Sequence, residues 1–565
     1  MSRWNQLFES HSLRIFSSTM IIYILITFMA GCGAGKFEIP KPLPSDQRNG
    51  PEPEERDLNI LANGFNRQFA TQIKQSLDLS RHFRKLVGRP KEAMNVNAFD
   101  EAPNSSWYTN RNAMKRMSIE EMSRGPNQGA VPDPTVTWTV TRAKAEGVTP
   151  GFSIVDSHGG NYVIKFDPWG YRELATGAEV VSTKLFHAAG YNVPQNYIVH
   201  FDPEILKLGE KVKITDEKGR KRFMTQEDLD DILERIERLP DGRIRAAASK
   251  YLVGGLKGPF KYRRTRDDDP NDIVPHHHRR ELRGLRVMAE WLNHFDTKAN
   301  NTLDVYTEDG YMKHYLIDFG STLGSQGNEP MPREIGHENT VDPHAIFIRT
   351  VTLGLYVQPW EKTVSIRYPS IGYFRPDILR PQKYKFIVPN PAFENLTPRD
   401  GFWGAKQVMS FTDEQLKAAV AAGEYSDPEA ADYLLKTLIT RRDTVGRYWF
   451  SRMNPLDKFE LQEDSDGKQA LCFVDLAVES GLESADQSEY RYDLKHKGIL
   501  IEKSELIKKT CILLPEAPET AFDESDFWEL RIYTRRGSDD KWMKPVEVYL
   551  HPDGAKTVSL VGIRH

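Results

Sequence analysis

Two short stretches decide how this chain folds: His-Phe-Asp-Thr-Lys-Ala-Asn-Asn at residues 294–301, and Asp-Phe-Gly at residues 318–320. A helix is predicted just before the first stretch, from Arg279 to His294, because apolar residues recur there at helical spacing. Between the two stretches, strand-like runs flank a Glu-Asp-Gly turn, which predicts a short hairpin. A helix, a polar loop, a hairpin and a second polar triplet therefore follow one another.

These stretches resemble the catalytic loop and the metal-binding triplet of the protein-kinase-like superfamily, whose patterns are H-R-D-x-K-x-x-N and D-F-G. The resemblance implies that Asp296 lies against the hydroxyl that is phosphorylated and that Lys298 neutralises charge on the transferred group. It implies that Asn301 and Asp318 hold Mg²⁺ on the phosphates of ATP, because magnesium prefers oxygen ligands. Either motif alone is weak, since Asp before Phe-Gly is common in turns, but both occur in order.

The resemblance extends to a small lobe before these motifs. Two strand patterns, at residues 147–156 and 161–166, are joined by a Ser-His-Gly-Gly hairpin signal. By resemblance, Gly151 approaches the nucleotide phosphates, and Lys165, at the end of a β-branched strand, is the lysine that binds them. The G-x-G-x-x-G pattern of kinases is absent from this region. The alternative for Lys165 is a solvated lysine at a strand end.

A helix is predicted from Thr176 to Ala189, closed by a glycine. Glu179 on this helix is the candidate for the ion pair that orients Lys165, and Glu173 is the reserve. The next segment, Gly-Tyr-Asn-Val-Pro at residues 190–194 and a strand at residues 196–201, resembles the HipA-type version of the small lobe. That likeness favours the atypical kinases (HipA-like, CotH-like and lipid-kinase-like) over ordinary eukaryotic protein kinases.

Residues 203–275 are predicted to be an insertion, with a charged helix at residues 226–238. The basic-then-acidic run at residues 261–272 either binds an anion or is a solvated loop with weak local ion pairs, and the second interpretation is favoured. Three adjacent histidines at residues 276–278 point in different directions, so they do not form a closed metal site by themselves. No Ala-Pro-Glu occurs between Gly320 and Pro343, so peptide docking of the usual kinase type is not expected.

Two helices with capping signals at Thr412 and Ser426 are predicted to complete the large lobe. From Lys458 onward, alternating segments separated by polar turns predict a small antiparallel β domain, such as a sandwich. Its two cysteines, Cys472 and Cys511, either pair or remain as buried thiols.

The N-terminus carries Arg3, Arg14 and an apolar run at residues 20–29 that ends in Met-Ala-Gly-Cys. This pattern resembles a bacterial lipoprotein signal, which implies a lipidated Cys32 and attachment to an extracytoplasmic membrane surface (periplasm or outer membrane in a Gram-negative cell). The alternative is an uncleaved anchor helix. The polar segment at residues 104–111 is expected to be a strap packed by its aromatic residues, although contact with substrate is an alternative.

The chain of 565 residues is long enough for several domains. The predicted fold class is α+β, a two-lobed protein-kinase-like fold with a C-terminal antiparallel β domain. The predicted organisation is a signal peptide at 1–31, a flexible tether at 32–57, a helical strap segment at 58–135, a kinase-like domain at 136–455 (small lobe 136–202, insertion 203–275, large lobe 276–455) and the β domain at 456–565.

The function implied is an ATP- and magnesium-dependent phosphotransferase acting on an unidentified hydroxyl of a protein, lipid or glycan. A net charge of −4 gives no reason to expect a nucleic-acid partner. Export of the protein would limit its supply of ATP, because compartments outside the cytoplasm hold little of this nucleotide. Two alternatives therefore stay open: an inactive kinase-like scaffold, and a nucleotidyl transferase on the same fold.

Overall fold

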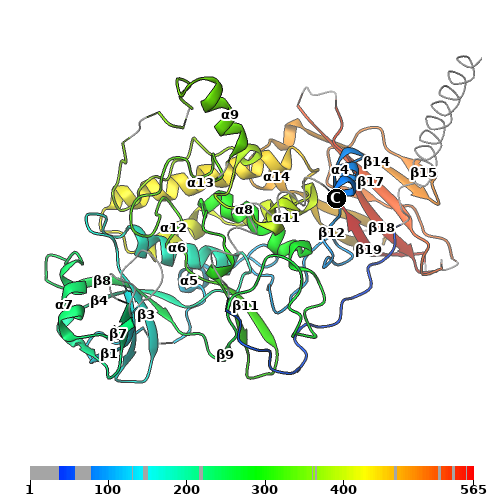
Figure 1. Ribbon diagram of the computed structural model, residues 1–565. Coiled ribbons are helices and arrows are strands. Elements are labelled where there is room, and N and C mark those ends of the chain that lie inside the picture. Colours follow the sequence, from blue (N-terminus) through cyan, green and yellow to red (C-terminus); the bar gives the residue numbers. More distant parts are fainter. Residues whose placement is uncertain are drawn as a thin grey trace, which may run out of the picture.

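The computed structural model describes most of the chain from Phe37 onward (Figure 1). The predicted signal peptide, Cys32 and residues 58–77 of the predicted helical strap segment lie outside the described residues. The described ranges are 37–57, 78–88, 90–129, 131–143, 151–215, 221–340, 342–358, 360–362, 365–463, 467–519, 523–537, 541–554 and 556–565.

The small lobe is built on a sheet with the strand order β4-β8-β3-β2-β1-β5, covered by the helix α6 (Leu174–Ala188) (Figure 1). β2 and β3 form the predicted hairpin, and β-branched and aromatic side chains fill the core beneath them. The strands are β1 (Trp138–Ala143), β2 (Gly151–Asp156), β3 (Asn161–Lys165), β4 (Asn196–Phe201), β5 (Leu206–Leu208) and β8 (Ile244–Lys250).

The sequence predicted that the small lobe ends at residue 202, and this boundary is wrong. β8 comes from the stretch predicted to be an insertion, and it pairs with both β3 and β4 inside the sheet. Its sequence, Ile-Arg-Ala-Ala-Ala-Ser-Lys, has one β-branched residue and three alanines, so the pattern did not reveal it. β5 also comes from that stretch, and a short hairpin of β6 (Lys213–Thr215) and β7 (Lys221–Phe223) leads into α7 (Gln226–Glu234), whose Leu229 and Leu233 join the apolar core of the small lobe.

The large lobe is helical and surrounds α8 (Arg280–Leu292), the helix predicted before the first motif. α8 packs closely on α11 (Pro398–Met409) at two glycines, Gly284 and Gly404. A Cβ atom on Gly404 would lie only 2.8 Å from the carbonyl oxygen of Gly284, so no larger residue fits there. The hairpin between the motifs is confirmed as β10 (Thr302–Tyr306) and β11 (Met312–Leu316), with β9 (Gly255–Leu256) at its edge. The other helices are α9 (Pro343–Val351), α10 (Pro391–Glu394), α11 (Pro398–Met409), α12 (Asp413–Ala421) and α13 (Pro428–Phe450).

The capping predictions for this lobe are half right. Thr412 caps α12 in a capping box with Gln415, as its sequence predicted. α13 is capped by Asp427 rather than Ser426, since the Asp427 side chain accepts from the Glu429 N–H. The start of α11 has the same capping chemistry, a box from Thr397, although no helix was predicted there.

The N-terminal segment is a strap across the large lobe, and it contains α4 (Leu79–Leu86) and α5 (Ile119–Arg124). The Trp107 ring stacks on His314 with a centroid distance of 3.5 Å, and the Tyr108 hydroxyl donates to Gln407. Both aromatic side chains are buried, which confirms that they act as packing anchors.

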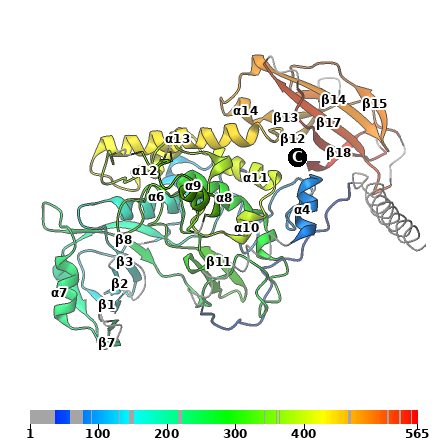
Figure 2. The ribbon, with the colours of Figure 1, turned by 45° about the horizontal axis from the view of Figure 1, so that its top comes forward.

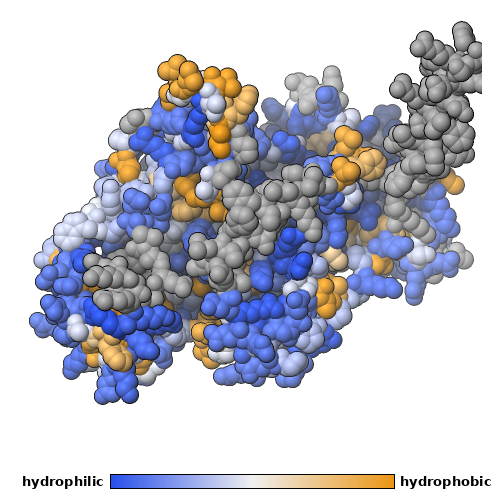
Figure 3. Space-filling view, in the orientation of Figure 1, coloured by the Kyte–Doolittle hydropathy of each residue, from blue (hydrophilic) through white to orange (hydrophobic). Residues whose placement is uncertain are grey.

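α9 stands apart from the packed helices. Figure 3 shows apolar side chains gathered over it at the top of the molecule, and Phe347 and Leu353 are largely exposed. No helix within the described ranges is both long and apolar enough to cross a membrane.

The C-terminal domain consists of two antiparallel sheets with a shared apolar core (Figure 2), as predicted. One has the order β12-β13-β16 and the other β15-β14-β17-β18-β19. Phe37, where the described chain begins, stacks on Tyr549 of the second sheet. The elements are β12 (Leu456–Glu463), β13 (Gln469–Asp475), α14 (Leu476–Glu479), β14 (Ser488–His496), β15 (Ile499–Lys503), β16 (Cys511–Leu513), β17 (Trp528–Arg536), β18 (Val546–Pro552) and β19 (Val558–Arg564).

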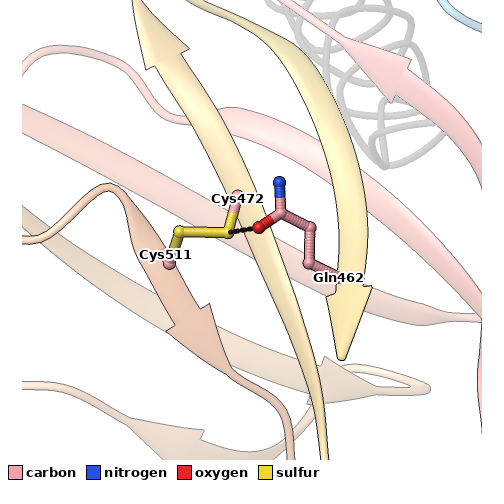
Figure 4. Close-up of a disulfide and its surroundings, with 3 residues drawn as sticks. All are labelled: Gln462, Cys472 and Cys511. Atoms are coloured by element: carbon pink, nitrogen blue, oxygen red, sulfur yellow. Dashed lines mark hydrogen bonds between the residues drawn. A yellow bond between two sulfur atoms is a disulfide. The ribbon is translucent and has the colours of Figure 1, made fainter. Parts of the chain in front are cut away.

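The two cysteines of this domain form a disulfide. Cys472 on β13 lies directly opposite Cys511 on β16, and Figure 4 shows the bond crossing between these strands. The bond closes a loop with a sequence separation of 39, which removes conformational entropy from the unfolded chain.

Replacing both cysteines (C472S/C511S) is expected to lower the unfolding free energy of the β domain by about 2–4 kcal/mol, since the unfolded loop regains its freedom. Urea unfolding followed by tryptophan fluorescence measures the change. Wild-type protein in reductant is the matched control and should unfold like the variant. Equal stability of oxidised wild type and variant would contradict the prediction.

Candidate active site

The ammonium group of Lys165 is the centre of the site. Its Nζ atom lies 2.9 Å from Glu179 Oε2 and 2.9 Å from Asp318 Oδ1. Lys165 ends β3, Glu179 is on α6, and Asp318 follows β11, so one cation joins three elements that are far apart in sequence. The reserve candidate, Glu173, accepts instead from the Ser426 N–H.

The three side chains of this bridge differ in solvent exposure, which increases from Glu179 to Lys165 to Asp318. The Glu179 side chain is 2% exposed, that of Lys165 is 17% exposed and that of Asp318 is 45% exposed. Burial would lower the pKa of Lys165, but the charges of Asp318 and Glu179 outweigh it and raise that pKa above its ordinary value. Lys165 is therefore charged at neutral pH, and since an ammonium has three donors, one remains for a ligand.

Asn196 completes the support of Glu179, and sequence reasoning missed it. Its Nδ2 donates to Glu179 Oε1 at 2.9 Å and to the Thr183 hydroxyl at 2.8 Å. One carboxylate oxygen thus faces the lysine and the other faces a fully buried amide on β4. A polar residue at the start of a buried strand is the signal that could have identified it.

The Asp-Phe-Gly triplet is fixed by the packing of its middle residue. Phe319 is buried and its ring lies 4.8 Å from Phe186 of α6 and 5.9 Å from His294. Asp318 itself has a φ of 65°, a left-handed conformation that turns the chain sharply after β11. Burial lowers the pKa of His294, so the neutral ring can donate from Nδ1 to the Ser321 carbonyl.

Asp296, Lys298 and Asn301 form a second cluster in the loop after α8. Asn301 Nδ2 donates to the backbone oxygen and to Oδ2 of Asp296, each at 2.9 Å. Lys298 Nζ lies 3.0 Å from Asp296 Oδ2, and its side chain is 44% exposed. Because the amide hydrogens of Asn301 face Asp296, its amide oxygen is left as a ligand atom.

The two clusters adjoin. The Ile317 N–H donates to the Asn301 carbonyl at 3.0 Å, which places Asp318 one residue from that contact. A carboxylate and an amide oxygen are hard donors that fit Mg²⁺. Gly151 pairs with Lys165 at the start of β2, so its backbone lies beside the lysine, while residues 144–150 are outside the described ranges.

Arg441 and Asn390 hold the loop that carries Asp296, and the sequence pattern predicted neither role. Arg441 of α13 is fully buried and donates to the carbonyls of Glu290 and Trp291, which satisfies the last turn of α8. Asn390 donates to the carbonyl of Thr297 at 3.2 Å. Such contacts join distant segments, and the local sequence does not encode them.

His276 of the histidine triplet has a structural role. His276 Nε2 lies 2.6 Å from Asp272, and its Nδ1 contacts the carbonyl of Lys261. Within the described ranges, no group of three or more histidine, cysteine, aspartate or glutamate side chains could hold a metal ion.

A strand lobe that carries a lysine, a helix that carries its glutamate and a helical lobe that carries the Asp-Phe-Gly triplet together make a kinase-like, two-lobed α+β fold. No family model matches the sequence, and no curated protein matches it.

Solved structures similar to the chain include a Helicobacter pylori proinflammatory kinase, CtkA, at 13% identity and a TM-score of 0.29, covering 56% of this chain and 99% of the kinase. The Golgi casein kinase with Mn/ADP bound matches at 12% identity and a TM-score of 0.28, covering 73% and 94%. A second Golgi casein kinase structure matches at 10% identity and 0.26, covering 73% and 96%. Because these TM-scores are low, the assignment rests on the ion pairs and strand order above.

Lys165→Met and Glu179→Gln are each expected to destabilise the protein, because the first leaves the buried Glu179 without its cation and the second removes one of the two carboxylates that offset the burial of Lys165. The double variant should be less destabilised than the sum of the single variants by about 1–3 kcal/mol. Urea unfolding of the four proteins measures this coupling. The exposed pair Lys417→Met and Glu414→Gln on α12 is the control and should be additive. Additivity at Lys165 and Glu179 would show that the ion pair is absent in solution.

Proposed function

We propose that this chain is a kinase-like phosphotransferase that uses magnesium and ATP to phosphorylate a hydroxyl group. The observation that carries the proposal is the bridge from Lys165 to Glu179 and Asp318. A lysine held between a buried and an exposed carboxylate suits phosphate binding, since it stays charged and keeps one donor.

The chain's own residues have separate roles in this proposal. Lys165 binds phosphate oxygens of the nucleotide, and Glu179 with Asn196 holds the lysine in place. Asn301 and Asp318 would hold the magnesium ion, which would neutralise charge developing on the phosphate oxygens.

Asp296 would orient the acceptor hydroxyl and take its proton. Its carboxylate is partly exposed and accepts from Asn301 and Lys298, which fixes the direction of its free edge. Lys298, whose side chain is partly exposed, can swing from Asp296 toward the transferred phosphate. The acceptor class stays open among hydroxyls of proteins, lipids and glycans.

Nucleotide binding is the first test. Mg-ATP at about a hundred times its dissociation constant should raise the unfolding free energy by roughly 2.7 kcal/mol. Asp318→Asn should abolish this stabilisation because it removes both a metal ligand and a partner of Lys165. Asp296→Asn should retain it while transfer falls by about 10²–10⁴-fold.

Mass spectrometry of protein incubated with Mg-ATP and candidate acceptors separates the alternatives. Added phosphate supports the proposal, whereas added AMP indicates nucleotidyl transfer. Absence of stabilisation by Mg-ATP in the wild type, with Asp318→Asn unchanged in every assay, would leave a kinase-like scaffold.

We also propose that the protein is a lipoprotein exposed outside the cytoplasm and attached through Cys32. The Cys472–Cys511 disulfide supports an oxidising compartment. Phe37 is packed against the β domain, and five residue steps span at most about 18 Å. A lipid on Cys32 would therefore keep the β domain close to the membrane surface.

Cys32→Ser is expected to move the protein from the membrane fraction to the soluble fraction, since no acylated cysteine remains. Cell fractionation with immunodetection measures the shift, and intact mass shows whether Cys32 carries lipid. Cys472→Ser is the control and should leave the protein in the membrane fraction. A membrane-bound, unlipidated Cys32→Ser protein would instead indicate an uncleaved anchor.

A further inference from the structure

A second polar site lies between the start of α8 and α10. A pocket of about 250 Å³ is enclosed by α4, Lys91, Arg263, the histidine triplet and α10. Figure 2 shows α4 near α10, and Arg81 Nη2 of α4 donates to the carbonyl of Glu394 at 2.8 Å. The pocket lies outside the catalytic loop but near it, because its lining residue Pro391 follows Asn390, which donates to the Thr297 carbonyl at 3.2 Å.

The lining of this pocket, here called the basic pocket, is dominated by cations. Arg81, Arg84, Lys91 and Arg263 all face it. Among the residues that the structure describes, Lys91 and Arg263 make no ion pair, and Arg84 Nε is buried without a hydrogen-bond partner. A buried guanidinium nitrogen with no acceptor is costly, so Arg84 Nε lacks the acceptor that it requires.

Two carboxylates also line the basic pocket, and they do not neutralise it. Asp78 accepts from the Ser80 hydroxyl and the Arg81 N–H at 2.9 Å each, which caps the start of α4. Glu394 is the other carboxylate. Four cationic side chains against two carboxylates leave a surplus of two positive charges.

Two histidines add donors to the basic pocket. His277 Nδ1 accepts from the Arg264 N–H at 3.3 Å, and His278 Nδ1 accepts from Arg283 Nη2 at 2.5 Å. Both partners can only donate, so each ring carries its proton on Nε2. Burial and the surrounding cations lower the pKa of His277 to about 4 and that of His278 to about 3. Neutral imidazoles with an Nε2–H are hydrogen-bond donors.

A solvated basic loop, the interpretation favoured from sequence, does not account for this geometry. The cations come from separate segments that converge on one enclosed volume, rather than from one run at residues 261–264. Guanidinium groups, an ammonium and imidazole N–H groups together match an acceptor-only ligand with two negative charges.

We propose that the basic pocket binds a phosphate group, as the free ion or as a phosphate monoester, at a site separate from the catalytic loop. Phosphate supplies the oxygens that Arg84 Nε, Lys91, Arg263 and the histidine N–H groups lack. This site does not depend on the proposed phosphotransferase activity.

Isothermal titration calorimetry of the full-length protein with inorganic phosphate tests the proposal, in potassium chloride at matched ionic strength. One site is expected, and Lys91→Gln with Arg263→Gln should raise its Kd by at least about tenfold, because two direct charges are lost. Lys417→Gln with Lys436→Gln, exposed on α12 and α13, removes the same charge and should change Kd by less than about twofold.

Saturating Mg-ADP separates this site from the nucleotide site. Phosphate binding should persist in the presence of Mg-ADP. A comparison of O-phosphoserine with inorganic phosphate identifies the ligand class: O-phosphoserine should bind more tightly if the natural ligand is an ester, and more weakly if it is the free ion. The proposal is overturned if the Lys91 and Arg263 variant binds phosphate as the wild type does, if Mg-ADP displaces all bound phosphate, or if no saturable binding occurs.

Discussion

One ammonium group connects the two lobes of this protein. Lys165 belongs to the sheet of the small lobe, while Asp318 belongs to the large lobe, and the contact of 2.9 Å between them spans the boundary. The lysine can bridge them only if α6 is seated against the sheet, because Glu179 fixes its other side. The position of a helix, the turn at Asp318 and the end of a strand therefore depend on one another.

The large lobe gains its geometry from buried charge as much as from apolar packing. Arg283 pairs with Asp400 at 2.9 Å, and both side chains are fully buried. Such pairs add little net stability because desolvation opposes them, yet breaking one is costly. They also restrict which helix faces can meet, which suits a lobe that must hold a catalytic loop in one position. The fully buried arginines include Arg266, Arg280, Arg283 and Arg441.

Sequence predicted the parts of the fold that are locally encoded. The hairpin of β10 and β11, the helix α8 and the capping of α12 follow from periodicity and capping signals over a few residues. β8 was missed because its alanines carry no strand signal, although pairing with β3 and β4 decides its state. The supports at Asn196 and Arg441 were missed for a similar reason, since each acts on a segment far away in the chain.

The strap has a consequence for how the lobes move. Thr109 donates to the carbonyl of Gly190 behind α6, and Asn112 donates to Ser410 at the end of α11, so one short segment is bonded to both sides of the boundary. If the two lobes bent about a hinge, this segment would either move with them or lose one of its hydrogen bonds. A fragment that begins at β1 would lose the hydrogen bonds of Thr109 and Asn112. The smallest part of the chain expected to fold on its own therefore starts well before β1.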